Sequence, residues 1–315
     1  MRFVLALAIL APAAAGAQVC DDAPLSRAAA ALLASGARVT SDSLLEAARA
    51  AGSDAPVLDA VVIRDGDPAR RARFLSRARA RRGTIACGEA RDGARWIVLA
   101  APRAGRIDLD GSGALRVALE PGLRAARLYA QDADARIWQA PVRPGEPVAL
   151  PPELVPPIVV QLVADGPDGP RPVAERRIGG GAEPLVPNDD RPLAARLATL
   201  RERAGAGALR PNRLLERVAR DHAERVCREA RVSHLAGGDP EARLARAGLA
   251  ARHVGEAIAR AEDGARAYAA LLRSPSHRAA LVDRRFTDVG LGLARGEGGA
   301  CLVVLLAAWP RAVPR

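Results

Sequence analysis

The sequence predicts an α+β fold built from three successive regions, the last of which is a three-layer α-β-α sandwich. Three observations lead to this prediction. Helix and strand patterns alternate in an α/β region over residues 18–103, and short apolar runs broken by Pro and Gly fill residues 104–178. Helical patterns precede two closing strands within residues 192–310. At 315 residues, the chain is long enough for two or three domains with their own cores.

The first region, residues 18–103, mixes the two kinds of element. We expect helices over 25–34, after Ser41, and over 68–80, where Pro68 suits the first helical position. The runs 84–90 and 95–101 are separated by an Asp-Gly turn that is typical of a β-hairpin. Because the region contains no histidine, we expect it to act as a scaffold or spacer.

The second region, residues 104–178, shows short apolar alternations at 115–119, 126–130, 137–140 and 158–164. Frequent turns at short spacing predict a small domain resembling an all-β sandwich. Residues 179–191 follow it with three successive glycines and several prolines, which is the composition of a linker.

The third region, residues 192–310, begins with helical patterns at 192–204 and, after an Asn212 cap, up to about 228. Asp239-Pro240-Glu241 begins another helix, and a further one should cover 264–272. A glycine-rich turn joins the final strands, 287–294 and 300–308. Helices on both sides of a central antiparallel sheet give the three layers.

Residues 1–17 have the pattern of a secretory signal peptide. Arg2 precedes an apolar run that ends at Pro12, and small residues lead to an A-x-A cleavage site at Ala15-Gly16-Ala17. The apolar run is too short for a membrane anchor, and the residues before Cys20 do not suit a lipoprotein site, so both alternatives are less favoured. No later stretch is apolar enough to span a membrane. We therefore expect a secreted protein, either periplasmic or extracellular.

The cysteines are interpreted in the light of export. Cys20, Cys87, Cys227 and Cys301 make an even number, which favours disulfides in an oxidising compartment. Two lie in each half of the chain, so we favour Cys20 with Cys87 and Cys227 with Cys301. Three connectivities remain open from the sequence alone.

The net charge of +11 does not indicate nucleic-acid binding. Every basic residue is Arg, and residues 191–315 hold 23 Arg against 13 acidic residues, so 10 of the 11 excess charges fall there. The chain also has only 3 Trp, 2 Tyr and 3 Phe, too few for a platform that stacks bases. We interpret the excess as a solvated Arg-rich surface, and leave open a basic face toward anionic glycan, envelope polymer or lipid.

All histidines of the chain lie in the third region, at 222, 234, 253 and 277. Around them stand Ser233-His234, Gly255-Glu256-Ala257-Ile258-Ala259, Ser274-Pro275-Ser276-His277-Arg278 and the stretch from Phe286 to Gly292. In their residues and in their order along the chain, these motifs resemble the bacterial secreted branch of the CAP superfamily, also called SCP-like. That superfamily includes cysteine-rich secretory proteins, venom antigen 5 and plant pathogenesis-related proteins. The resemblance is confined to the C-terminal part, residues 192–310.

The resemblance implies a ligand cleft lined by two His and two Glu that can hold a divalent metal. The first His, first Glu and second His fall on His234, Glu256 and His277, but the second Glu falls on Ser274. The family's Trp, three positions earlier, falls on Leu271, and its Asn after the first Glu is Ala257. Two imidazoles and one carboxylate suffice for Zn²⁺ with a water in the open position, whereas Mg²⁺ and Ca²⁺ prefer several oxygens. If a metal binds, we expect zinc.

Two histidines have simpler interpretations. His222 falls on the apolar face of its predicted helix, so we expect a core histidine. His253 lies three residues before Glu256, and we expect the segment to enter a strand, where such residues face opposite sides.

The sequence leaves three functional hypotheses. The leading one is a non-catalytic envelope or extracellular protein that binds a lipid, glycan or protein ligand, with a possible weak metal site. The alternative is a metal-assisted hydrolase of peptide or cell-wall polymer centred on His234, Glu256 and His277, in which Glu256 and His277 are the catalytic candidates. No third residue orients His277 toward Ser274 or Ser276, so a Ser-His-acid triad is not supported. The third hypothesis assigns partner binding to the middle β-domain and a scaffold role to the last domain.

Overall fold

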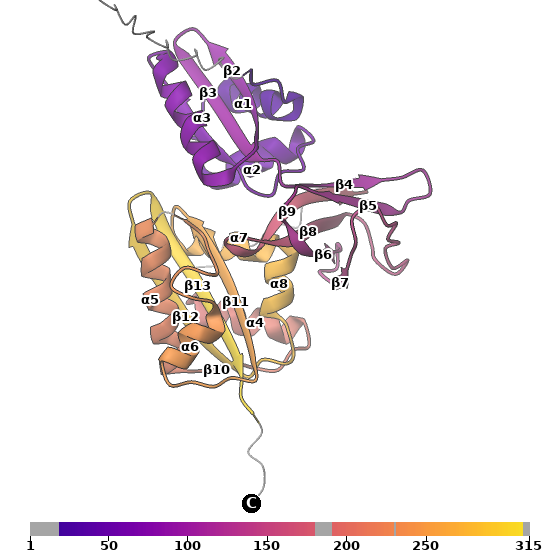
Figure 1. Ribbon diagram of the computed structural model, residues 1–315, viewed down its shortest axis with the longest axis vertical. Coiled ribbons are helices and arrows are strands. Elements are labelled where there is room, and N and C mark those ends of the chain that lie inside the picture. The colour runs from indigo at the N-terminus through magenta and orange to yellow at the C-terminus, as the bar shows by residue number, and fades with distance from the viewer. Residues whose placement is uncertain (1–18, 180–190, 230, 311–315) are drawn as a thin grey trace, which may run out of the picture.

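A computed structural model describes residues 19–179, 191–229 and 231–310, and it confirms the α+β class (Figure 1). The predicted signal peptide, residues 1–17, lies outside the described residues, as does nearly all of the predicted linker at 179–191. None of the helices in the described ranges has both the length and the apolar character needed to cross a membrane.

The N-terminal region forms an antiparallel sheet of order β1-β3-β2 between helices. Its strands are β1 (Asp59–Ile63), β2 (Ile85–Asp92) and β3 (Arg95–Pro102). Helices α1 (Ala23–Ser35) and α2 (Ser41–Ala50) share a core with one face, and α3 (Pro68–Arg82) shares a core with the other. Pro68 is the first residue of α3, and β2 and β3 form the predicted hairpin. β1 contains the apolar residues that end at Ile63, a run not named among the predicted elements.

The middle region is all β, with two antiparallel sheets that enclose one core. β4 (Gly105–Leu109) pairs with β5 (Leu115–Leu119). The larger sheet has the order β7-β6-β8-β9 and consists of β6 (Arg124–Gln131), β7 (Ile137–Pro141), β8 (Ile158–Gly166) and β9 (Gly169–Ile178). Strands β4 and β9 have no counterpart among the predicted runs. The hairpin of β8 and β9 reaches the C-terminal domain, where its turn accepts a main-chain hydrogen bond.

The C-terminal region has a central sheet of order β10-β12-β13-β11. β10 (Arg210–Pro211) is parallel to β12 (Asp288–Gly296), while β11 (His253–Ala261) and β12 both pair antiparallel with β13 (Gly299–Ala308). Helices α5 (Arg213–Glu229) and α6 (Pro240–Arg246) share a core with one face of the sheet. The other face shares a core with α4 (Leu193–Arg203), α7 (Gly264–Arg273) and α8 (Pro275–Leu281).

Helix α5 packs against β12 with almost no space between the two backbones. A Cβ atom added at Gly290 would lie 2.2 Å from the backbone carbon of Leu215, and one at Gly292 would lie 2.2 Å from that of Ala219. Since real Cβ atoms do not approach so closely, only glycine allows α5 to lie at this height over the sheet.

Two disulfides confirm the favoured cysteine pairing. Cys20 bonds to Cys87, and Cys227 on α5 bonds to Cys301 on β13. Because the sulfur of Cys20 is already bonded to Cys87, it is not available for the thioether of a lipid anchor.

Each of the three regions has apolar core residues of its own. Polar contacts cross the boundaries between the regions. Glu175 on β9 lies 2.5 Å from Arg49 on α2, and the main-chain N–H of Ser41 donates to Glu262 at 2.6 Å. The chain therefore consists of three regions with cores of their own, and hydrogen bonds and ion pairs are among the contacts that join them.

Candidate functional site

Glu256 stands in the middle of β11, where it lies opposite Leu305 on β13. Side chains alternate between the faces of a strand, so Glu256 points to the same side as Ile258, toward α5 and α6. Its side chain is only 2% exposed. A carboxylate at this depth requires partners, because an unpaired buried charge is strongly unfavourable.

Three side chains from other elements surround the carboxylate. His234, in the segment after α5, brings its Nδ1 to 2.9 Å from Glu256 Oε1. Arg243 on α6 donates from Nη2 to the other oxygen, Oε2. His222 on α5 places Nε2 at 3.7 Å from Oε1, which is beyond hydrogen-bond distance. Both oxygens of Glu256 are therefore occupied within the domain.

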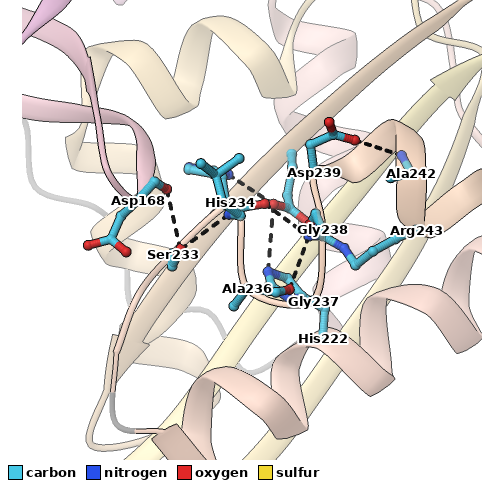
Figure 2. A network of polar contacts seen from close by, with 12 residues as sticks. Asp168, His222, Ser233, His234, Ala236, Gly237, Gly238, Asp239, Ala242 and Arg243 are labelled. Atoms are coloured by element: carbon cyan, nitrogen blue, oxygen red, sulfur yellow. Dashed lines mark hydrogen bonds and ion pairs between the residues drawn. The ribbon is translucent and has the colours of Figure 1, made fainter.

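Arg243 also fixes the loop that carries His234 (Figure 2). Its Nη1 donates to the main-chain oxygen of His234 at 2.9 Å and to that of Gly238. Its own helix starts at Pro240 because the Asp239 side chain accepts from the N–H of Ala242 at 2.7 Å. The guanidinium thus holds the imidazole and the carboxylate in one arrangement.

The ionisation of this cluster follows from its charges. Burial alone would raise the pKa of Glu256, but the hydrogen bond and charge of His234, with Arg243 and His222, lower it below its usual value. Burial lowers the pKa of His222, and the nearby Glu256 only partly opposes this. The favoured state is a charged Glu256 paired with Arg243, beside a neutral His222.

His277 lies on α8, a helix that the sequence analysis did not predict. Burial of its imidazole, together with the charge of His234, lowers its pKa to about 3. A neutral imidazole is therefore expected at any pH above about 4. Because the charge of His234 acts on His277, the two imidazoles lie in the same part of the domain. No contact between His277 and Glu256 is found among the described residues.

Ser274, the residue between α7 and α8, binds the middle domain rather than the cluster. Its Oγ donates to Gln161 Oε1 at 3.0 Å, and Ser276 Oγ donates to the same oxygen at 2.6 Å. On the other side, the main-chain oxygen of Asp168 accepts from the N–H of His234 at 2.9 Å. The β8–β9 hairpin therefore covers the region that the resemblance implies is open, and His234 is left with 13% exposure.

His222 and His253 lie where the sequence pattern predicts. His222 is buried on the inner face of α5. His253 is the first residue of β11, paired with Ala308, so the segment is a strand and not a helix.

Three residues that hold the site together were not among the predicted site residues, namely Arg243, Gln161 and Asp168. Arg243 is one of many arginines, and nothing in its spacing distinguishes it. The other two belong to the middle domain. Only a signal that links distant segments could have found them.

Comparison with known proteins identifies the domain that carries this site. The model of the cysteine-rich secretory protein (CAP) family matches residues 194–306. The C-terminal domain is a CAP domain. A search of curated proteins finds no match.

Solved structures similar to this chain include bacterial proteins with SCP or CAP domains. An outer surface protein from Borrelia burgdorferi is 25% identical with a TM-score of 0.36, and the match covers 38% of this chain and 90% of that one. An extracellular protein containing an SCP domain from Bacillus anthracis is 16% identical with a TM-score of 0.32, covering 65% and 89%. A cysteine-rich secretory protein from Staphylococcus aureus is 10% identical with a TM-score of 0.30, covering 75% and 89%.

The CAP cleft of this chain does not fit a resident zinc ion. Each oxygen of Glu256 is already held by one side chain, His234 or Arg243, so a zinc ion would have to compete with both for the carboxylate. The positive charge of Arg243 beside the carboxylate also opposes a cation. Across the described residues, no three side chains of His, Cys, Asp or Glu come together in a way that could hold a metal. The zinc site expected at His234, Glu256 and His277 therefore has no support in the side-chain arrangement.

Proposed function

We propose that this protein is an exported, non-catalytic binding protein whose CAP cleft recognises a ligand without transforming it. One observation carries the proposal: the Glu256 carboxylate is only 2% exposed and each of its oxygens is held by a side chain of the same domain. A general base must lie within reach of a substrate or water. Here one oxygen faces His234 Nδ1 and the other faces the Arg243 guanidinium.

The pKa shifts support the same proposal. A general base that works near pH 7 has its pKa raised toward neutrality, whereas the pKa of Glu256 is lowered. The pKa of about 3 keeps His277 neutral, so it carries no acidic imidazolium proton near pH 7. Neither catalytic candidate of the hydrolase alternative therefore has a pKa near neutrality: Glu256 and His277 are both weak bases, and neither holds a proton to donate near pH 7.

Export is part of the proposal. The two disulfides suit an oxidising compartment, and the signal-like pattern of residues 1–17 suits secretion. The ligand classes remain those of the sequence analysis, namely lipid, glycan or protein.

Zinc calorimetry on the full chain tests the proposal. We expect titration of ZnCl₂ at about pH 7.5 to give the same heats for the wild type and for a variant with His234→Ala and His277→Ala. Isolated peptidoglycan and casein, incubated with the protein, should release no soluble fragments. Saturable zinc binding that the double variant lacks, or hydrolysis that Glu256→Gln abolishes, would overturn the proposal in favour of the hydrolase.

A further inference from the structure

The turn between β8 and β9 lies directly on His234. Besides the bond from the N–H of His234, the main-chain oxygen of Asp168 accepts from Ser233 Oγ at 3.4 Å. The Asp168 carboxylate lies 2.6 Å from Arg231 Nη2. All three contacts reach Asp168 from the segment that follows α5, and Figure 2 shows the one to Ser233.

The next residue of the turn makes this approach possible. Gly169 has a φ of +88°, and a Cβ added there would lie 3.0 Å from the Cβ of His234. A side chain at this position would be strained by the backbone and crowded by the histidine. The cleft therefore receives a bare stretch of main chain.

The same hairpin makes a second contact through Gln161 on β8. This side chain is 1% exposed, and its Oε1 accepts from Ser274 Oγ, from Ser276 Oγ and from the N–H of Ser276 at 3.2 Å. Its Nε2 donates to Glu175 Oε2 at 3.2 Å on the neighbouring strand. The amide is thus bound at both ends, by the CAP domain and by its own sheet.

The side-chain contacts named above are hydrogen bonds and one ion pair. Helix α8 also packs against β6, β7 and β8, and β8 is paired with β6 inside the middle sheet. The hairpin can therefore leave His234 only by a rigid-body shift of the whole middle domain, in which each domain keeps its own core.

We infer that the CAP cleft is a peptide-binding site, that the β8–β9 hairpin is its intramolecular occupant, and that an external peptide enters by displacing the hairpin. This inference rests on the proposed function and selects one of its ligand classes. The CAP domain holds a main-chain carbonyl of the hairpin through His234 and Ser233, a carboxylate through Arg231, and a carboxamide through two serines. A turn-forming acidic peptide with glycine after the acidic residue offers the first two of these groups together. A lipid tail offers neither.

The departure from the family pattern at Ser274 has a physical reason in this arrangement. The hydroxyl donates to Gln161 Oε1. A glutamate, the residue that the CAP resemblance implies at this position, would bring a second acceptor with a negative charge against that oxygen. Ser274→Glu should therefore expel the hairpin, whereas Ser274→Ala removes one hydrogen bond and adds no repulsion.

The first experiment measures whether the hairpin covers His234 in solution. Full-length wild type, Ser274→Ala and Ser274→Glu are treated with diethylpyrocarbonate, and modification is followed by mass spectrometry with the half-buried His253 as internal reference. We expect His234 to react at least about tenfold faster in Ser274→Glu than in the other two, because reactivity follows the open population. Asp168→Ala serves as a second opening variant. Unchanged reactivity of His234 in both opening variants would overturn the inference.

The second experiment adds the occupant from outside. A fluorescent cyclised peptide with the sequence of residues 162–172 is titrated into each full-length protein and followed by anisotropy. We expect it to bind the opened variants at least about tenfold more tightly than the wild type, whose site is occupied. The same peptide with Asp168→Ala should bind more weakly. If His234 becomes reactive but the peptide does not bind, the peptide inference fails while the proposal of a non-catalytic protein stands, since that proposal fails only on zinc binding or hydrolysis.

Discussion

The two sides of the CAP cleft hold their polar side chains in different ways. On the side of α5 and α6, Glu256 is buried, charged and paired with Arg243 inside one domain. On the side of α8, Ser274 and Ser276 are neutral and bind Gln161 from another domain. The first side is fixed by a buried charge pair, and the second by hydrogen bonds that break when the domains separate. The difference indicates that one side maintains the fold while the other makes contact with an occupant.

The largest effect is expected from removing the charge of Glu256. Glu256→Gln keeps the shape but leaves the guanidinium of Arg243, only 7% exposed, without its counter-charge. Loss of one partner from a buried pair lowers the free energy of unfolding by about 3–5 kcal/mol. Urea unfolding monitored by circular dichroism measures it. Glu216→Gln, which removes an exposed pair with Arg220, is the control and should change stability by less than about 1 kcal/mol. If both variants lost the same free energy of unfolding, the pair of Glu256 and Arg243 would be no more important than an exposed ion pair.

A smaller effect is expected from the contact that crosses the domains. Gln161→Leu leaves the hydroxyls of Ser274 and Ser276 and one main-chain N–H without their acceptor, which lowers the free energy of unfolding by about 1–3 kcal/mol. The exposed Gln139 on the same sheet provides the control, since Gln139→Leu should change stability by less than about 0.5 kcal/mol. If Gln161→Leu changed the free energy of unfolding no more than Gln139→Leu, the contact between the domains would not contribute to stability in solution.

The pH dependence of stability separates the histidines from the carboxylate. The pKa of His277 is lowered to about 3 and that of His222 is also lowered, so the unfolded chain binds more protons below pH 6.5. Stability is therefore complete above pH 6.5 and falls with decreasing pH, by at most roughly 1.4 kcal/mol per pH unit for each histidine. The lowered pKa of Glu256 acts in the same direction only below pH 4.5. Urea unfolding between about pH 7.5 and about pH 5 isolates the histidines, and His277→Gln should flatten the slope. A slope that stays the same would show that His277 is not protected from protonation.

The smallest effect is expected from the rim of the cleft. Arg231, whose side chain is 57% exposed, pairs with Asp168, and such pairs contribute about 0.2–1 kcal/mol. Arg231→Ala should lower stability by that amount at low salt, and the difference should vanish in about 1 M NaCl because salt screens exposed charges. A loss that persists in high salt would mean that this contact resembles the buried pair of Glu256.

The sequence predicted the parts of this protein that local patterns determine. Pro68 marked the start of α3, an Asp-Gly turn marked the β2–β3 hairpin, and the position of the cysteines in the two halves indicated both disulfides. The motif resemblance placed the CAP domain, and within it His234 and Glu256 do meet.

What the sequence did not predict depends on contacts between distant segments. Arg243 acts on Glu256 only because α6 folds over β11, and arginine is too common in this chain to be noticed. Gln161 meets Ser274 across 113 positions and a domain boundary. Helix α8 is short and starts directly after α7, so its pattern merges with that of its neighbour. The covered state of the cleft follows from these contacts and had no local signal.

The glycines of β12 have a consequence for the chemistry above the sheet. Gly290 and Gly292 set the height of α5, and α5 carries His222 to 3.7 Å from Glu256. A methyl group at either position would push α5 away from the sheet. That movement would change the electrostatic environment of the Glu256 carboxylate and the start of the loop that carries His234. Gly290 and Gly292, which carry no side chain, thereby determine how closely His222 can approach Glu256.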